Sequence, residues 1–243
     1  MEYSKLFLPG RGLMVAFVGS LRIGGRGRDR NKPSPVTEEP KPYLEEKYTK
    51  ANSIIEYDIR DVVRLPSDMD FNEWFGTNLL SFFSNVNLLY GVLSGEYCTN
   101  ETCPNMLGPG GVQYYWHDEK GKKTKCSAPL YIDYVMTYAQ RTMNDESTFP
   151  SKYGNVFPSD FEAIMQRILR LLFNVVAHIY HAHFMQLVQL DLHLHLNCVF
   201  SHIVIFCKEN KTLEITKEVN PLEDLIDALQ LNSRPSGSNS ASS

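Results

Sequence analysis

The sequence predicts an all-α protein, a helical bundle with one small β-hairpin inserted in it. Three long segments place apolar residues at the three- and four-residue spacing of a helix that packs on a core. Two of these segments begin with a capping pair, in which a side chain able to bind free backbone amides is followed three residues later by glutamate. One hydrophobic core built mainly from helices is therefore expected.

The first long helix is predicted to begin near Asp70, which forms an Asp-x-x-Glu capping signal with Glu73. Its apolar residues recur at helical spacing over about five turns. We interpret this stripe as core packing; its members are Phe71, Trp74, Phe75, Leu79, Phe82, Phe83, Val86 and Leu89.

Two further helices are predicted after the hairpin. One runs from Pro129 to about Asn144 and presents on one side Tyr131, Val135 and Tyr138. The next opens at Ser159, paired with Glu162 in a second capping signal, and continues through an apolar series toward Asp191. At over about 30 residues, this helix is long for a globular protein.

The segment from Leu192 to Lys208 fits either an apolar helix or a buried strand, because many of its residues are β-branched or aromatic. Its length favours a helix. A final short helix is predicted with Asn220 as N-cap and Pro221 at the first helical position, and it runs through Leu231.

The predicted hairpin joins Gln113-Tyr-Tyr-Trp-His-Asp118 to residues 122–126 across a Lys-Gly turn. No other stretch has the pattern of paired strands. The extended structure is therefore expected to be a small insert in the helical domain.

The 243 residues are expected to form one helical domain, residues 43–231, between two disordered tails. Residues 1–42 form a basic leader rich in Gly, Pro and charged side chains, and residues 232–243 form a Ser-rich tail. No apolar run approaches the roughly 20 residues that a membrane-spanning helix requires, so no membrane span is expected.

The net charge of −4 is distributed unevenly along the chain. Residues 1–50 carry 10 Lys and Arg against 6 Asp and Glu, whereas residues 51–230 carry 13 against 22. The acidic domain would repel nucleic acid and favour a basic partner surface, although a solvated acidic face without a partner explains the charge equally well.

Five cysteines, an odd number without the spacing of a disulfide framework, indicate reduced thiols or metal ligands: Cys98, Cys103, Cys126, Cys198 and Cys207. A cytoplasmic and nuclear location fits such thiols. The apolar stretch Gly12–Leu21 could be read as a weak signal-peptide core, but a disordered leader is the better interpretation.

Two clusters carry residues that bind metals, Cys98-Thr-Asn-Glu-Thr-Cys103 and His178-Ile-Tyr-His-Ala-His183. A Cys pair on a loop and a His pair on a helix would supply a tetrahedral zinc site. On an ideal helix His178 and His183 lie about 140° apart, whereas His178 and His181 share a face. The spacing alone therefore leaves the choice of histidines open, and buried thiols with core histidines remain the alternative.

The sequence gives little support to catalysis. The His-Glu-x-x-His pattern of zinc hydrolases, the phosphate-binding Gly-rich loop, the Gly-x-Ser-x-Gly elbow and the kinase signatures are all absent. Cys98 as a nucleophile with His178 as its base is a remaining alternative without local signatures. We therefore expect that the protein is not an enzyme.

Several strings, in order and spacing across residues 43–231, resemble the Mob (Mps-one-binder) family. They are Leu65-Pro66, Phe71-Asn-Glu-Trp74, Phe82-Phe83, Asn87-Leu-Leu-Tyr90, Tyr97-Cys-Thr-x-x-x-Cys-Pro104, Tyr114-Tyr-Trp116, Lys125-Cys-Ser-Ala-Pro129, Phe149-Pro-Ser-Lys-Tyr-Gly154 and Ala177-His-Ile-Tyr-His-Ala-His-Phe184. Lys41-Pro-Tyr-Leu-Glu45 and Gly121-Lys-Lys-x-Lys-Cys-Ser-Ala-Pro129 are similar to the subgroup that binds NDR-type kinases.

The resemblance implies a Mob-like helical bundle with one structural Zn²⁺. The family pattern assigns the zinc ligands to Cys98, Cys103, His178 and His183 and leaves His181 out, so an irregular helix or long rotamers must bring the two histidines together. It also implies a surface that binds the N-terminal regulatory segment of an NDR/LATS-family AGC kinase, with candidate residues Asp70, Glu73 and Trp74.

The sequence departs from the family's best-known activators at two places. Met69 stands where one carboxylate of an acidic pair is expected. Three basic residues that hold a phosphorylated peptide become Arg170, Leu171 and Asn174, so phosphopeptide binding is not expected.

The expected function is that of a non-catalytic adaptor and co-activator in Hippo/NDR signalling, which binds the N-terminal segment of such a kinase and shifts its conformation. The alternative is a scaffold or competitive inhibitor that occupies the same segment without activating the kinase.

Overall fold

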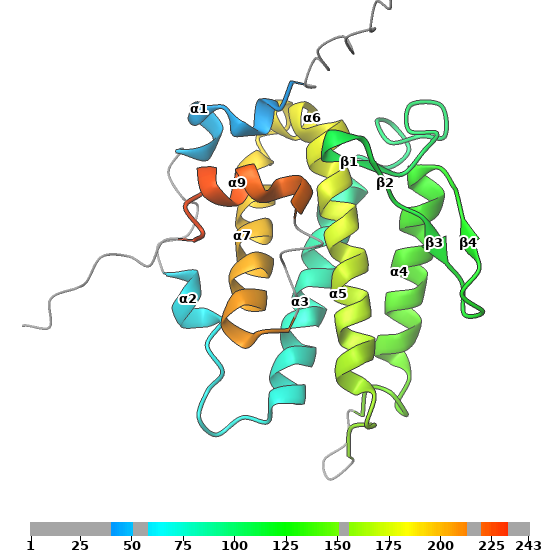
Figure 1. The fold of residues 1–243 in the computed structure, drawn as a ribbon, viewed down its shortest axis with the longest axis vertical. Coiled ribbons are helices and arrows are strands. Elements are labelled where there is room, and N and C mark those ends of the chain that lie inside the picture. The colour runs from blue at the N-terminus through cyan, green and yellow to red at the C-terminus, as the bar shows by residue number, and fades with distance from the viewer. Residues whose placement is uncertain (1–39, 51–57, 151–155, 213–219, 233–243) are drawn as a thin grey trace, which may run out of the picture. The chain divides into compact units, whose positions relative to one another are not determined.

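The computed structural model of the chain describes residues 40–50, 58–150, 156–212 and 220–232 (Figure 1). All of these residues belong to one compact unit, Glu38–Ser243. The predicted leader, up to residue 39, and the tail from residue 233 lie outside the described residues. The described unit is helical with two short pairs of strands, which confirms the all-α class with a small hairpin.

The first long helix, α3 (Phe71–Gly91), begins where its capping signal predicts. The Asp70 side chain accepts hydrogen bonds from the backbone amides of Asn72 at 2.8 Å and Glu73 at 3.3 Å, which satisfies two amides that the first turn leaves free. The predicted apolar stripe is buried or half-buried, with Phe75, Leu79 and Val86 fully enclosed. The interpretation of this stripe as core packing is confirmed.

The helix α5 (Phe161–His178) lies at the centre of the unit and contacts α3, α4 (Ala128–Asn144) and α7 (His193–Asn210) (Figure 1). Ten of its residues are buried, which explains its nearly continuous apolar sequence. The predicted Ser159 cap is wrong. The helix starts at Phe161 behind Asp160, and no side chain caps it, because residues 159 and 160 form a turn.

The predicted single helix toward Asp191 is irregular. After α5 the chain forms a π-helical segment, Ile179–His183, and then α6 (Phe184–Gln189). Asp191, at a φ of 57°, lies in the left-handed region and is outside the helix. By length and composition alone Phe161–Gln189 could cross a membrane, but 61% of its most apolar window is buried inside the unit, as in the core helix of a soluble fold.

The stretch that fitted either a helix or a strand forms α7, which is confirmed as a helix. The last predicted helix is shorter than expected. A 3₁₀ turn occupies Asn220–Leu222, and α9 (Glu223–Ala228) follows with Leu222 rather than Asn220 at its N-cap position. A proline directly after the predicted cap fits the first turn of a 3₁₀-helix as well as that of an α-helix, so the sequence did not distinguish these two kinds of helix.

The predicted hairpin is present but short, with β3 (Trp116–His117) antiparallel to β4 (Lys123–Thr124). Gln113, predicted to belong to it, pairs elsewhere. Together with Val112 it forms β2 (Val112–Gln113), which is antiparallel to β1 (Leu107–Gly108). The Gln113 side-chain amide also donates to the backbone carbonyl of Met106 at 2.9 Å, which holds this second pair in place.

Three short helical pieces lie near the start of the unit: η1 (Pro42–Leu44), α1 (Glu46–Thr49) and α2 (Ile59–Val62). The helices α1 and α2 contact α7, and η1 contacts α6 and α9. The buried Asn197 side chain fastens α1 by donating to the Tyr48 carbonyl at 2.9 Å, and it accepts from the Tyr180 hydroxyl at 2.8 Å. Both polar ends of this buried amide are therefore satisfied.

Candidate functional site

Cys98 and Cys103 lie on a tight loop that follows the carboxyl end of α3. The Cys98 amide donates to the Leu93 carbonyl at 2.9 Å, and the Cys103 amide donates to the Thr99 carbonyl at the same distance. Inside the loop, the Thr102 hydroxyl accepts from the Thr99 amide at 2.9 Å and donates to the Tyr97 carbonyl at 2.7 Å. The threonines between the cysteines thus hold both thiols on one side of the loop.

His178 and His183 come from the end of α5 and from the π-helical segment. A π-helix bonds residue i to residue i+5 and so has a wider turn than an α-helix, which brings residues five apart to nearly the same face. The two rings have centroids 5.2 Å apart and an interplanar angle of 77°. The expectation that an irregular helix closes the gap between these histidines is confirmed.

The loop and the helix bring the four predicted ligands together. All four potential ligand atoms lie within 4.8 Å of one another, and all four residues are buried. The distance from Cys98 Sγ to His178 Nε2 is 3.7 Å, and the distance from Cys103 Sγ to His183 Nε2 is 3.4 Å. Tetrahedral zinc bonds of about 2.3 Å to sulfur and 2.0–2.1 Å to nitrogen require a sulfur–nitrogen edge of about 3.6 Å. The cluster could therefore hold a metal ion.

Burial lowers the pKa of the two histidines and raises the pKa of the Cys98 thiol. It lowers the pKa of His178 to about 4 and that of His183 to about 4, which keeps both imidazoles neutral with a lone pair available. Burial, reinforced by the neighbouring Cys103, raises the pKa of the Cys98 thiol to about 12. A buried thiolate here needs a cation beside it, and a coordinated metal ion would supply that charge.

The two histidines differ in the hydrogen bonding of Nδ1, the ring nitrogen that does not face the cysteines. His178 Nδ1 lies 2.8 Å from the Leu107 carbonyl in β1, which fixes the ring and leaves Nε2 for the metal. His183 Nδ1 is buried and has no hydrogen-bond partner among the described residues. Leu107 was not identified from the sequence, because a backbone carbonyl leaves no signal in the residue type.

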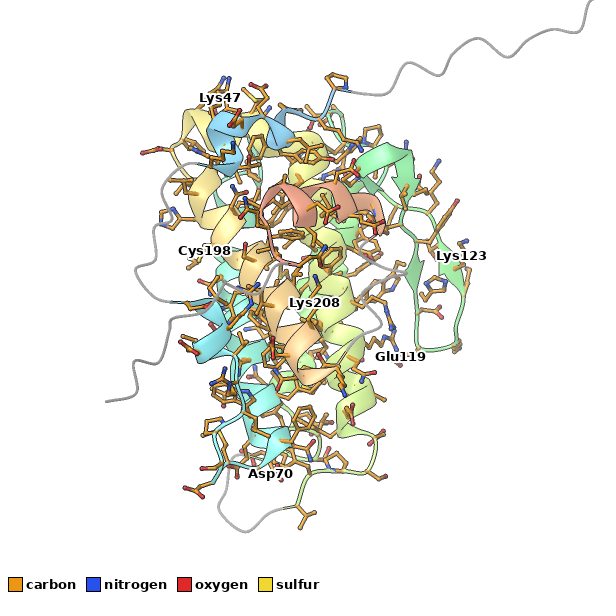
Figure 2. All side chains as sticks on the ribbon, turned by 60° about the vertical axis from the view of Figure 1, so that its left-hand side comes forward. Lys47, Asp70, Glu119, Lys123, Cys198 and Lys208 are labelled. Carbon is orange, nitrogen blue, oxygen red and sulfur yellow. The ribbon has the colours of Figure 1, made fainter. Side chains whose placement is uncertain are left out.

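The kinase-binding candidates lie at the opposite end of α3 from the cysteine loop. Over the length of this helix the separation is about 30 Å, and Figure 2 labels Asp70 at that far end. Asp70 and Glu73 are exposed, whereas Trp74 is half-buried. The indole Nε1 of Trp74 is buried without a hydrogen-bond partner in the described part of the chain.

Two exposed leucines on the outer face of α3 were missed by the sequence reasoning, which identified only the core stripe. At helical spacing from Glu73, this outer face contains Leu80, 41% exposed, and Leu88, 70% exposed. Large aliphatic residues that fall outside the core stripe are the signal that could have identified it.

The three positions matched to the basic phosphopeptide residues lie on α5, and only Arg170 among them is basic. Arg170 is exposed and Leu171 is half-buried. The Asn174 amide donates to the Tyr131 hydroxyl at 2.9 Å, so this side chain is turned toward α4.

Comparisons with known proteins agree on one family. The family model described as Mob1/phocein matches residues 51–222. Human MOB kinase activator 2 is 45% identical over 206 residues, which cover 84% of this chain and 85% of the human protein. MOB kinase activator-like 2 of Drosophila pseudoobscura pseudoobscura is 44% identical over 224 residues, 92% of this chain but only 39% of the fly protein. MOB kinase activator-like 1 homolog A of Dictyostelium discoideum is 37% identical over its full length and 87% of this chain.

Proposed function

Because the chain belongs to the Mob1/phocein family, we propose that it is a non-catalytic adaptor that binds the N-terminal regulatory segment of an NDR/LATS-family AGC kinase and raises its activity. Relatives at 37–45% identity are named as kinase activators. The proposal places the protein in the cytoplasm and nucleus, within Hippo/NDR signalling.

The exposed face of α3 supports a docking role. Glu73 lies in the first turn of this helix and is exposed, and Leu80 and Leu88 extend the same face toward its carboxyl end. An exposed carboxylate beside aliphatic side chains suits a basic amphipathic segment, because charge sets its orientation while apolar contacts supply affinity. The excess of acidic residues in 51–230 favours the same class of partner.

The metal in this proposal is a single structural Zn²⁺ held by Cys98, Cys103, His178 and His183. Two thiolates and two imidazoles are a common zinc donor set, and the sulfur–nitrogen distances fit the edges of its tetrahedron. With four protein ligands, the shell has no position for water or substrate, which supports a non-catalytic role. Zinc would join the cysteine loop to the end of α5.

The binding test is a charge reversal at Glu73. Against a peptide of the kinase N-terminal segment, we expect Glu73→Lys to weaken binding by about 2 kcal/mol, roughly thirtyfold, because it places a positive charge opposite a basic partner. The melting temperature should hardly change, since Glu73 is exposed. Glu223→Lys is the matched control, because Glu223 is also exposed in a first helical turn.

A reciprocal charge swap on the kinase segment should restore part of the loss in a double-mutant cycle. Unchanged affinity in Glu73→Lys would remove this residue from the interface. Failure of the wild-type protein to bind any NDR/LATS segment would defeat the adaptor proposal.

A kinase assay separates activation from its alternative. Added wild-type protein should raise the activity of the full-length kinase, and Glu73→Lys should need a higher concentration for the same effect. Binding without any rise in activity would instead identify a scaffold or a competitive inhibitor.

A further inference from the structure

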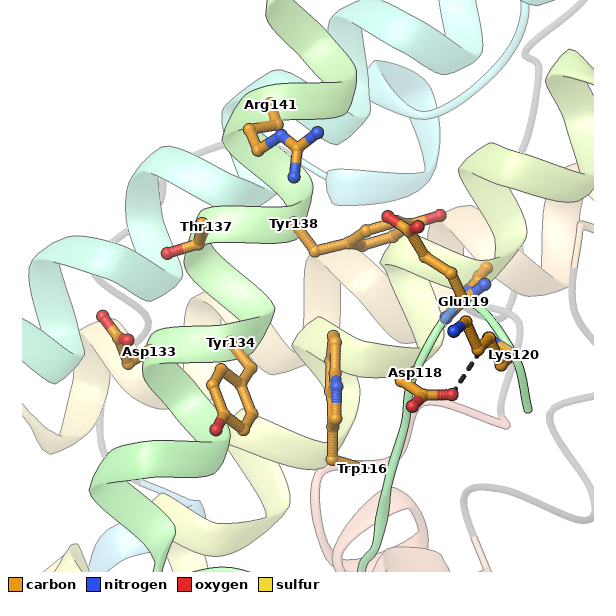
Figure 3. Close-up of a pocket in the computed structure, with 10 residues that line it drawn as sticks. Trp116, Asp118, Glu119, Lys120, Asp133, Tyr134, Thr137, Tyr138 and Arg141 are labelled. Carbon is orange, nitrogen blue, oxygen red and sulfur yellow. Dashed lines mark hydrogen bonds between the residues drawn. The ribbon is translucent and has the colours of Figure 1, made fainter. Parts of the chain in front are cut away.

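A pocket of about 520 Å³ lies between the β3–β4 hairpin and α4, on residues that the proposed function does not use. Figure 3 shows Trp116 from the hairpin beside Tyr134 and Tyr138 from α4. Arg141 lies farther along the helix, and Asp133 lies next to Tyr134 on the flank of the helix. The site therefore combines an aromatic surface with charged side chains from two separate elements.

The three aromatic rings form a continuous ledge. The Trp116 ring centroid lies 5.3 Å from that of Tyr134 at a tilt of 42° and 6.3 Å from that of Tyr138 in an edge contact. All three side chains are half-buried, so each is held by its neighbours and still presents surface to solvent. Such contacts leave no room for a ligand between the rings, and a ligand would have to lie across them.

Arg167 of α5 braces this ledge from one side. Its guanidinium carbon lies 4.7 Å from the Tyr138 ring centroid, and its Nη2 donates to the His117 carbonyl at 3.2 Å. The hairpin is thereby tied to α4 through a third element. The ledge is therefore organised before any ligand arrives, which reduces the ordering that binding requires.

The two ends of the ledge carry opposite charges. Asp133 and Arg141 are exposed and lie two turns apart on α4, and neither forms an ion pair with another described residue. Asp118, in contrast, already accepts from the backbone amides of Lys120 at 2.9 Å and Lys122 at 2.8 Å. Asp133 and Arg141 are therefore available to set the direction of a bound chain.

A second hollow of about 530 Å³ continues from the first along α4 and reaches Asp145. The Asp145 carboxylate already accepts hydrogen bonds from the Ser147 amide at 3.0 Å and the Ser147 hydroxyl at 2.8 Å, which leaves Asp133 as the carboxylate available to a ligand at an end of the groove. The two hollows share Glu119, Thr137, Tyr138 and Arg141, so they form one groove. From Asp133 to Asp145 the helix rises about 18 Å. A polyproline II chain covers this length with about six residues.

We propose that this groove binds a proline-rich segment of a partner protein in the polyproline II conformation, with a basic residue of the segment at the Asp133 end. Prolines pack flat on aromatic ledges, and the polyproline II backbone has no internal hydrogen bonds, so its carbonyls are free to accept from side chains of the groove. The backbone amides of α4 are bonded within the helix, and β3 and β4 are only two residues long, so the groove offers little strand edge to which a partner could add a strand. Six of the ten lining residues of the first hollow are charged, which does not suit the apolar face of a helix.

The test uses the full-length protein and three fluorescent peptides. One is an arginine followed by eight prolines, which spans the groove, the second replaces the arginine with glutamate, and the third replaces the prolines with Gly-Ser repeats. By fluorescence anisotropy, we expect the Arg-proline peptide to bind at least about tenfold more tightly than the Gly-Ser peptide. It should also bind more tightly than the Glu-proline peptide, because its charge complements Asp133.

Two variants locate the site. Tyr134→Ala should weaken Arg-proline binding by about tenfold or more, and Asp133→Arg should reverse the preference toward the Glu-proline peptide. Glu209→Arg, which makes the same charge change at an exposed residue of α7, should change neither, and melting curves should show that all variants are folded.

Three results would overturn the proposal. The first is the absence of binding by both proline peptides at millimolar concentration. The second is unchanged binding in Tyr134→Ala and Asp133→Arg together. The third is a phosphothreonine peptide that binds in a manner sensitive to Tyr134→Ala when the proline peptides do not, which would assign the groove to a different class of ligand.

Discussion

His183 and His181 lie on one short π-helical segment, yet only His183 reaches the cysteines. The His183 Nε2 atom is 3.4 Å from Cys103 Sγ, whereas His181 is outside the four-residue cluster. His183 is 3% exposed, so removal of its side chain would leave a buried cavity beside Cys103.

We expect His183→Ala to lose bound zinc and to unfold or severely loosen the domain, because a structural zinc site contributes on the order of 10 kcal/mol. His181→Ala, the matched control, should keep one zinc per chain. Elemental analysis and circular dichroism of both proteins measure this. Full zinc occupancy in His183→Ala would refute this ligand assignment.

Asp70 has both a structural role and a proposed binding role, and two substitutions separate them. Its carboxylate caps α3 through the Asn72 and Glu73 amides. Asp70→Ala should cost about 1 kcal/mol of stability, whereas Asp70→Asn should cost little, because asparagine caps as well as aspartate.

Both substitutions at Asp70 remove its charge, so both should weaken kinase-segment binding to a similar extent if that charge faces the partner. Denaturant unfolding and calorimetry report the two effects separately. An affinity that falls only in Asp70→Ala would show that the residue acts through capping alone.

At the scale of elements, α3 has a buried apolar face and an outer face with two exposed leucines. Phe75, Leu79 and Val86 pack into the core, whereas Leu80 and Leu88 are exposed on the other side. Single exposed leucines are common on soluble proteins, so the inference of docking depends on their alignment with Glu73 along one helix.

We expect Leu88→Asp to leave the melting temperature nearly unchanged, because the side chain is 70% exposed, and to weaken binding of the kinase segment by about tenfold or more. Leu190→Asp is the control, because Leu190 is 43% exposed and lies outside α3. Thermal melts and binding titrations of both variants give the comparison. Equal affinities for the two variants would remove the outer face of α3 from the interface.

For the whole molecule, the candidate metal centre joins segments that are far apart in the chain. The cysteine loop is fastened to the start of α4 by the Ala128 amide, which donates to the Cys103 carbonyl at 3.0 Å. The Leu107 carbonyl of β1 bonds His178 at the end of α5. Loss of the metal would therefore affect the packing of α4 and α5 together.

A zinc chelator should therefore lower the melting temperature of the whole domain strongly, since the binding energy of a structural zinc is comparable to the roughly 5–15 kcal/mol stability of a domain. Zinc added back should restore it, whereas magnesium should not, because magnesium prefers oxygen ligands. Circular dichroism melts follow both steps. A melting temperature insensitive to chelation would contradict a structural metal.

Local signals in the sequence determined much of this fold. The Asp70 cap, the core stripe of α3, the extent of α4 and the presence of a hairpin all depend on neighbouring residues, so they could be predicted without knowledge of the tertiary structure. The paired cysteines and histidines indicated a metal site for the same reason. The cap of α5 was wrong by one residue, because a turn at residues 159 and 160 competes with the capping signal at Ser159.

The tertiary structure decided what depends on distant partners. Residue spacing did not decide which two of the three histidines lie beside the cysteines. The π-helical segment between α5 and α6 decides it, because it turns His183 toward Cys103. Gln113 pairs with Leu107 of β1, which precedes it in the chain, and not with the strand that follows the Lys-Gly turn. The local sequence around Gln113 does not distinguish these two partners. The aromatic ledge beside α4 depends on the contact of Trp116 with Tyr134, residues that belong to different elements. Periodicity and caps encode how a segment folds, but the meeting of two segments depends on packing that no local pattern contains.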